Sequence, residues 1–221
     1  ATAYIADDAV TAAKIASGLK LVTTDAQNNT VAGTNAGDSF TGTDANYNSL
    51  FGYNAGTAIT TGDNNAAFGF YAGLAITTGA RNTAIGSDAL RIATTGSDNT
   101  AVGTNAMYYC TTASNNTAVG KGALLANTTG GDNVAVGKNA LDANTTASNN
   151  VAVGHDALTS NTTGTQLVGI GKNALASNTT ASNNIAVGYL AMNANTTGTD
   201  NLAVGKEALK ANTTANNNTA I

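Results

Sequence analysis

Few side chains in this sequence are of types that perform catalysis, and those few are scattered. His155 is the only histidine and Glu207 the only glutamate among the 221 residues. A glycoside hydrolase requires two positioned carboxylic acids, and a hydrolytic triad requires a nucleophile, a base and an orienting acid. Neither a recurring carboxylate pair nor a Ser/His/Asp set is present. We therefore predict that the protein is not an enzyme, with no catalytic residue and no cofactor.

The same residues give no signature of a metal or disulfide site. Cys110 is the only cysteine and cannot form an intrachain disulfide, so we expect a small buried thiol, with an interchain bridge as the alternative. His155 lies in a variable row of solvated side chains, and an ion held by three copies of it on an oligomer axis is the alternative. The Gly-rich calcium nonapeptide of RTX proteins is absent. We predict no metal ligand.

A strict 17-residue period dominates the chain. Ten glycines recur at this spacing, each with Ala three residues later, Thr-Thr eight and nine residues later, and Asn four residues earlier, where Leu167 is the one exception. We expect the glycines to mark turns that need positive φ or a close backbone approach, and the asparagines to form an amide ladder along the stack. The turn glycines are Gly52, Gly69, Gly86, Gly103, Gly120, Gly137, Gly154, Gly171, Gly188 and Gly205. The expected asparagine ladder comprises Asn48, Asn65, Asn82, Asn99, Asn116, Asn133, Asn150, Asn184, Asn201 and Asn218.

The length of the period selects the architecture. Helical repeats and propeller blades are longer than 17 residues. Short apolar alternation between Gly, Asn and Thr is typical of brief strands joined by turns. The sequence therefore predicts an all-β parallel β-solenoid with one coil per repeat, each coil containing two strands of four or five residues. Ten coils stacked at the interstrand spacing would form a rod segment of about 48 Å.

The strand pattern N-x-A-(V/I)-G is apolar on both of its faces. The Val or Ile before the glycine shares one face with the residue two positions earlier, such as Val151 and Val153, whereas Ala152 points to the other face. We expect the Val/Ile row to lie in the core and the Ala row to meet another chain, because strands apolar on both faces are usually covered on both. The alternative is a monomeric solenoid with a mildly apolar outer face.

The ends of the chain differ from its middle. Residues 1–25 lack the repeat and are predicted to form a short helical or extended neck. Residues 26–47 read as a degenerate first coil with a two-residue insertion, because Gly33 and Gly52 are 19 residues apart. Residues 48–221 contain the ten coils and the start of an eleventh. No cap is visible at Ile221 and an open end exposes strand edges, so we expect further fibre, virion or cell-surface segments at both ends.

Composition and aromatic placement bound the partners. Only 10% of residues are charged and the net charge is −4, so no basic footprint for nucleic acid is present, and no apolar run is long enough to span a membrane. Tyr53, Phe70 and Tyr71 occupy turn positions, where they could stack on a glycan or pack at an interface. The Thr-Thr rows raise ice binding as a separate hypothesis, although adjacent threonines favour a turn with one hydroxyl used locally.

The run Asn127-Thr-Thr-Gly-Gly-Asp-Asn-Val-Ala-Val-Gly137-Lys-Asn-Ala-Leu141 resembles the repeats of trimeric left-handed β-rolls. Such repeats occur in the heads of YadA-type trimeric autotransporter adhesins and in related phage tail-fibre proteins. The resemblance covers residues 29–221, with the Asn-Thr-Thr-Gly loop as a departure, because adhesin heads use a somewhat shorter repeat. The segment from Ile5 to Ala16 is similar to phage tail-fibre linkers.

This resemblance implies a parallel homotrimer, left-handed winding and a role in host attachment. The expected function is the shaft of a phage tail fibre or similar extracellular appendage that presents a host- or surface-binding tip. The alternatives are an adhesin head on a bacterial cell surface that binds matrix or glycan directly, and an ice-binding solenoid. The expected partners are other copies of the chain, adjoining fibre segments and a host glycan or surface receptor.

Overall fold

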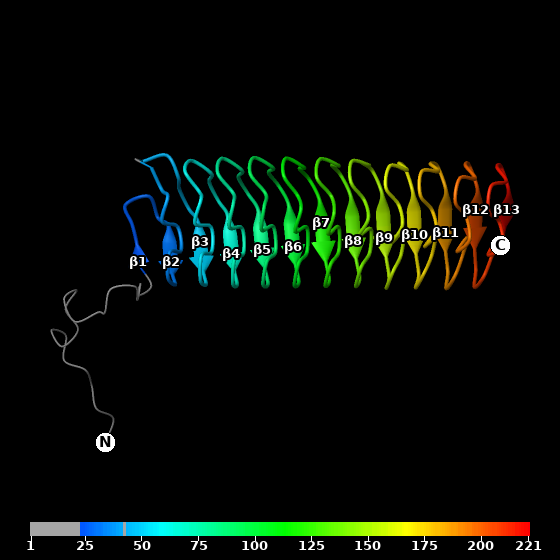
Figure 1. Cartoon of the computed structure of the whole chain (residues 1–221), viewed down its shortest axis with the longest axis horizontal. Helices are drawn as coiled ribbons and strands as arrows, with labels where there is room; N and C mark the ends of the chain where they lie inside the picture. Colours follow the sequence, from blue (N-terminus) through cyan, green and yellow to red (C-terminus); the bar gives the residue numbers. More distant parts are fainter. Residues whose placement is uncertain (1–22, 42) are drawn as a thin grey trace, which may run out of the picture.

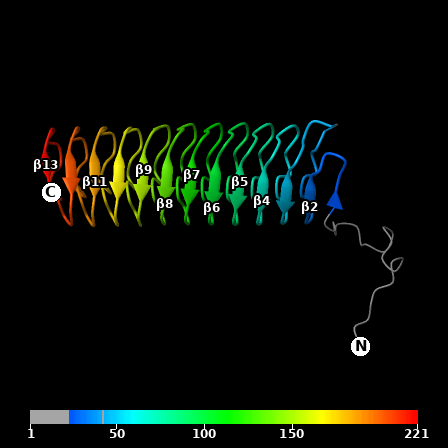
Figure 2. The ribbon, with the colours of Figure 1, turned by 180° about the vertical axis from the view of Figure 1, so that it is seen from behind.

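The chain forms a rod of stacked coils. A computed structural model describes residues 23–41 and 43–221, and Figure 1 shows its strands side by side along one long axis, with the same order seen from behind in Figure 2. The described residues contain no helix. The predicted parallel β-solenoid with 17-residue coils is therefore confirmed. Most of the predicted neck, residues 1–22, lies outside the described residues.

Thirteen short strands form a single sheet in sequence order. Their bounds are β1 Thr23–Thr24, β2 Thr30–Ala32, β3 Ser49–Phe51, β4 Ala66–Phe68, β5 Thr83–Ile85, β6 Thr100–Val102, β7 Thr117–Val119, β8 Val134–Val136, β9 Val151–Val153, β10 Val168–Ile170, β11 Ile185–Val187, β12 Leu202–Val204 and β13 Thr219–Ala220. Each coil thus has one strand of two or three residues, and the prediction of two longer strands per coil was wrong. Turns that bond to the neighbouring coils make up the rest.

The register follows the repeat. From β3 onward each strand residue pairs in parallel with the residue 17 positions later, as Val151 does with Val168. The β2–β3 step is 19 residues, with Thr30 opposite Ser49. At the start of the stack β1 pairs antiparallel with β2, so a hairpin rather than another parallel coil covers β2.

The two faces of the sheet are opposite to expectation. The central strand residue, such as Ala118, Ala135 and Ala152, faces the interior and is 0% exposed. The Val/Ile row points outward, with Val136 36% and Ile170 38% exposed. The interior is filled from the opposite wall, where a Cβ added at Gly169 would lie 3.1 Å from Leu158 Cγ. This leaves room for little more than alanine on the strand.

Two positions in each coil share the task of filling that opposite wall. The early coils combine glycine with a large residue three positions later, as in Gly73 and Ile76. From Leu90 onward a buried Leu or Met occupies the first position, and Ala93, Cys110 or an asparagine occupies the second. The first position has positive φ in both groups, 58° at Gly73 and 50° at Leu90. The leucines thus accept an unfavourable backbone conformation in exchange for burial.

Exchanging these two side chains tests this reciprocal packing. Leu90→Gly should cost about 2–5 kcal/mol through a cavity, and Ala93→Ile about 1–3 kcal/mol through overpacking. The double variant reproduces the Gly73–Ile76 arrangement of the preceding coil. It should therefore be more stable than the sum of the single effects by about 2 kcal/mol, measured by urea denaturation. Additive effects would contradict the shared cavity.

Candidate functional site

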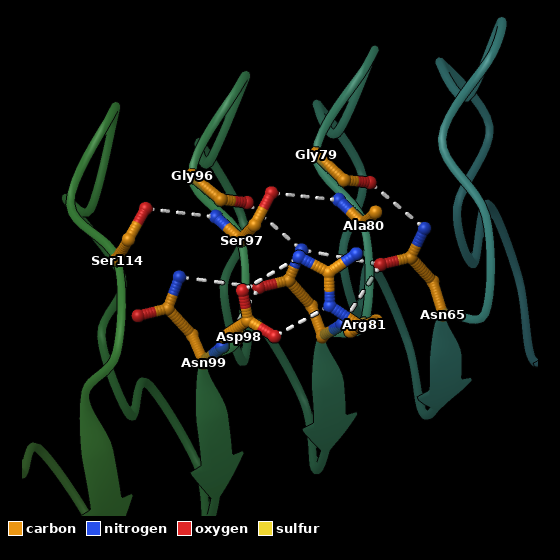
Figure 3. A network of polar contacts seen from close by, with 10 residues as sticks. Asn65, Gly79, Ala80, Arg81, Gly96, Ser97, Asp98, Asn99 and Ser114 are labelled. Carbon is orange, nitrogen blue, oxygen red and sulfur yellow. Dashed lines mark hydrogen bonds and ion pairs between the residues drawn. The ribbon is translucent and has the colours of Figure 1, made fainter.

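An asparagine ladder runs through the interior of the rod. Asn82 donates its backbone N–H to Asn65 Oδ1 at 3.0 Å, and its Nδ2 donates to the same oxygen at 3.1 Å and to the Gly96 carbonyl at 2.9 Å. The same pattern recurs from coil to coil (Figure 3). The structure places the predicted ladder residues in this row, and Asn29 extends it by one coil. Leu167, which is fully buried, offers no oxygen to Asn184 and interrupts the row.

The ladder begins at a carboxylate. Asp25 Oδ1 accepts the backbone N–H of Asn29 at 2.8 Å, and Oδ2 accepts its Nδ2 at 3.0 Å. Burial acts to raise the pKa of Asp25, but hydrogen bonds from Asn29 and Gln27 lower the pKa overall. Asp25 therefore takes the place of an earlier asparagine, and as an ionised acceptor it needs no donor beneath it.

A second asparagine ladder was not anticipated. It consists of Asn127, Asn144, Asn161, Asn178, Asn195 and Asn212. Asn144 Nδ2 donates to Asn127 Oδ1 at 2.9 Å and to the Ala147 carbonyl at 3.0 Å. The Ala147 carbonyl also accepts Asn133 Nδ2 of the first ladder, so the two ladders are joined within each coil. The 17-residue recurrence of Asn before Thr-Thr was the available signal, and it also places these glycosylation-type sequons inside the rod.

Cys110 occupies the second-ladder position of its coil. Its Sγ lies 3.7 Å from the Ala113 carbonyl, where later coils place an amide nitrogen, and the side chain is fully buried. Burial raises the pKa of this thiol to about 12, although the hydrogen bond to Ala113 opposes the shift. The environment matches the small buried thiol expected from the sequence.

Cys110 should consequently resist thiol reagents in the native rod. At about pH 8 we expect negligible reaction with a soluble disulfide reagent, because the thiolate is scarce and the sulfur inaccessible. Full reaction should follow unfolding in denaturant. Rapid labelling under native conditions, or an interchain disulfide isolated from native material, would contradict this placement.

The turn glycines combine both features expected of them. Gly154 has φ 135°, and a Cβ built on it would lie 2.6 Å from the carbonyl carbon and oxygen of Gly171 in the next coil. Gly137 shows the same arrangement toward Gly154. The backbones of neighbouring coils therefore approach so closely at this corner that no side chain fits between them.

The paired threonines divide their roles. The first of each pair is half-buried and donates its hydroxyl along the rod, as Thr94 Oγ1 does to the Thr111 carbonyl at 3.0 Å. The second, such as Thr95 and Thr112, is exposed. One hydroxyl is thus used, as expected, but by the next coil rather than locally. The arrangement leaves a single free threonine row from this pair instead of a two-row threonine lattice.

The aromatic residues of the early coils pack on one another. Tyr53 and Phe70 are stacked with ring centroids 5.5 Å apart, and Tyr71 lies 4.0 Å from Phe70. The Arg91 guanidinium lies 4.6 Å from the centroid of Tyr71 and donates to Asp88 at 2.9 Å. Much of the ring-face area is therefore already occupied by neighbouring rings and by Arg91, which favours the packing interpretation over glycan stacking.

The remaining titratable residues form no ligand cluster. His155 Nδ1 pairs with Asp156 at 2.8 Å, and Asp142, whose pKa is raised mainly by burial, accepts the Thr159 hydroxyl at 2.7 Å. Within the part of the chain that the structure describes, no group of three His, Cys, Asp or Glu residues could hold a metal ion and no pocket is found. No helix among the described residues could cross a membrane.

No protein-family model matches the chain, and comparison with curated proteins and with solved structures gives no significant match. The function is therefore argued from the geometry of the rod.

Proposed function

We propose that the chain is a structural rod, the shaft of a tail fibre or similar extracellular appendage, built from three parallel copies with left-handed coils. The observation that carries this proposal is the unbroken parallel stack from β2 to β13, whose interior is sealed by two hydrogen-bonded ladders. Such a stack has length and stiffness but no pocket among the described residues. These are properties of a spacer that holds a binding tip at a distance.

The outer face of the sheet supports the assembly of several copies. In β8 to β12 both outward positions are aliphatic, as in the pair Val151 and Val153 and the pair Val168 and Ile170. Ile170 and Ile185 remain 38% and 42% exposed in the single chain. In earlier strands one of the two positions is polar or small, for example Thr100. A contiguous apolar face of this kind marks an interaction surface, and a second and third copy would cover it along the whole rod.

Substituting the outward row tests the assembly. The triple variant V136T/V153T/I170T keeps β-branched side chains but removes apolar surface, so each chain should still fold while association weakens by at least about tenfold. Sedimentation equilibrium should give three chain masses for the parent and a concentration-dependent lower mass for the variant. The control T129S/T146S/T163S, in the exposed second-threonine row, should keep the parent mass. A monomeric parent under native conditions would refute the proposal.

A further inference from the structure

The charges of the rod are unevenly distributed over its coil positions. Four lysines occupy the position directly after the turn glycine, at the corners that follow β7, β8, β10 and β12 (Figure 1). These residues, Lys121, Lys138, Lys172 and Lys206, are all exposed and are called the lysine row below. Coils are about 4.8 Å apart, so the row extends over about 24 Å along the axis.

The lysine row is unpaired, whereas the other described cations are paired. Arg81 binds Asp98 at 2.6 Å, Arg91 binds Asp88 at 2.9 Å and Lys210 lies 3.3 Å from Glu207. No ion pair involves a lysine of the row among the described residues. Their neighbours in sequence are also largely neutral, being Gly122, Asn139 and Asn173 after the first three lysines. The positive charge of the row is therefore free for an external partner.

The acidic position of the coil behaves differently. Asp98, Asp132 and Asp200 occupy the position before the ladder asparagine, and neutral residues always separate them, such as Asn115 and Asn149. Stacked like charges are destabilising, and this alternation avoids them. Lys121 and Lys138 nevertheless stand in adjacent coils, with His155 and Lys172 in the next two. The sequence thus tolerates along the basic corner the repulsion that it avoids along the acidic one.

We propose that the lysine row binds a linear acidic polysaccharide laid along the rod axis. A polymer with repeated carboxylate, sulfate or phosphate groups can meet successive lysines and relieve their mutual repulsion. Single-stranded nucleic acid fits less well, because its bases need aromatic side chains to stack on and the row contains only Tyr189. This inference deepens the proposed function by naming a surface polymer that such an appendage would contact.

Dextran sulfate, with uncharged dextran as the reference, is the probe for this site. The full chain should bind dextran sulfate at low salt and not dextran, and affinity should fall steeply as salt rises. K138Q/K172Q should weaken binding by about tenfold and reduce the slope of log affinity against log salt by about 2. The matched variant R81Q/K210Q, which removes two cations outside the row, should stay within about twofold of the parent.

Three outcomes would overturn the inference: no binding of the parent at low salt, equal weakening by both double variants, or a change in the native mass of K138Q/K172Q. The last outcome would mean that the lysines pair with another copy of the chain. Binding to single-stranded DNA in preference to dextran sulfate would also overturn it. A parent that is monomeric yet binds dextran sulfate through the row would refute the trimeric shaft and leave this site standing.

Discussion

Gly154→Ala should destabilise the rod by about 3 kcal/mol or more. Alanine at φ 135° is strained, and its Cβ would lie 2.6 Å from the carbonyl of Gly171 in the following coil. Because that carbonyl belongs to the backbone, the whole coil would have to shift rather than one side chain. Urea denaturation followed by circular dichroism measures the loss.

The same position in the last glycine-bearing coil is the natural control. Gly205 has φ 126°, but no atom lies within 4 Å of a Cβ built on it. Gly205→Ala should therefore carry the backbone strain without the clash and cost clearly less than Gly154→Ala. Equal losses would show that positive φ alone explains the recurring glycine and that close stacking of the coils contributes nothing at this corner.

Asn133→Ala should cost about 3 kcal/mol. The substitution removes the bonds from Asn133 Nδ2 to Asn116 Oδ1 and to the Ala147 carbonyl, and it leaves the backbone N–H of Asn150 without its acceptor at 3.0 Å. Buried groups deprived of a partner cost roughly 1–3 kcal/mol each. Thermal and urea unfolding both report the change.

Two further variants separate hydrogen bonding from volume. Asn133→Leu imitates the natural exception at Leu167 and should recover part of the loss by filling the space. Asn149→Gly removes an exposed amide from a position with φ 62°, which glycine accepts, and should change stability by less than about 0.5 kcal/mol. If Asn133→Ala proved as mild as Asn149→Gly, the ladder would be shown to add little to stability.

The fold was predictable because the period itself encodes it. Seventeen residues with one Gly, one Asn and one Thr-Thr pair per unit are too few for helical repeats, and identical units must stack in register. The ladder of Asn65 and Asn82 and the tight corner at Gly154 followed from side-chain chemistry at fixed spacing. Neither inference required knowing which way the strand faces.

The orientation of the strand was not predictable from the same reasoning. Alternation places Ala152 and Val153 on opposite faces but does not say which face is interior, since both are apolar. The answer depends on how far Leu141 and its equivalents reach across the coil, which is a tertiary property. The second ladder was missed for a related reason, because Asn144 before Thr-Thr reads locally as a turn or sequon, and its burial becomes visible only when coils are stacked.

Electron cryo-microscopy of the native rod tests the central claim most directly. A cross-section perpendicular to the rod axis should show three solenoids around a common axis, with the Val136, Val153 and Ile170 row turned inward and covered. The lysine row beginning at Lys121 should remain accessible on the outside. A single solenoid whose Val/Ile row faces solvent would contradict the proposed shaft, because the apolar face would then have no partner.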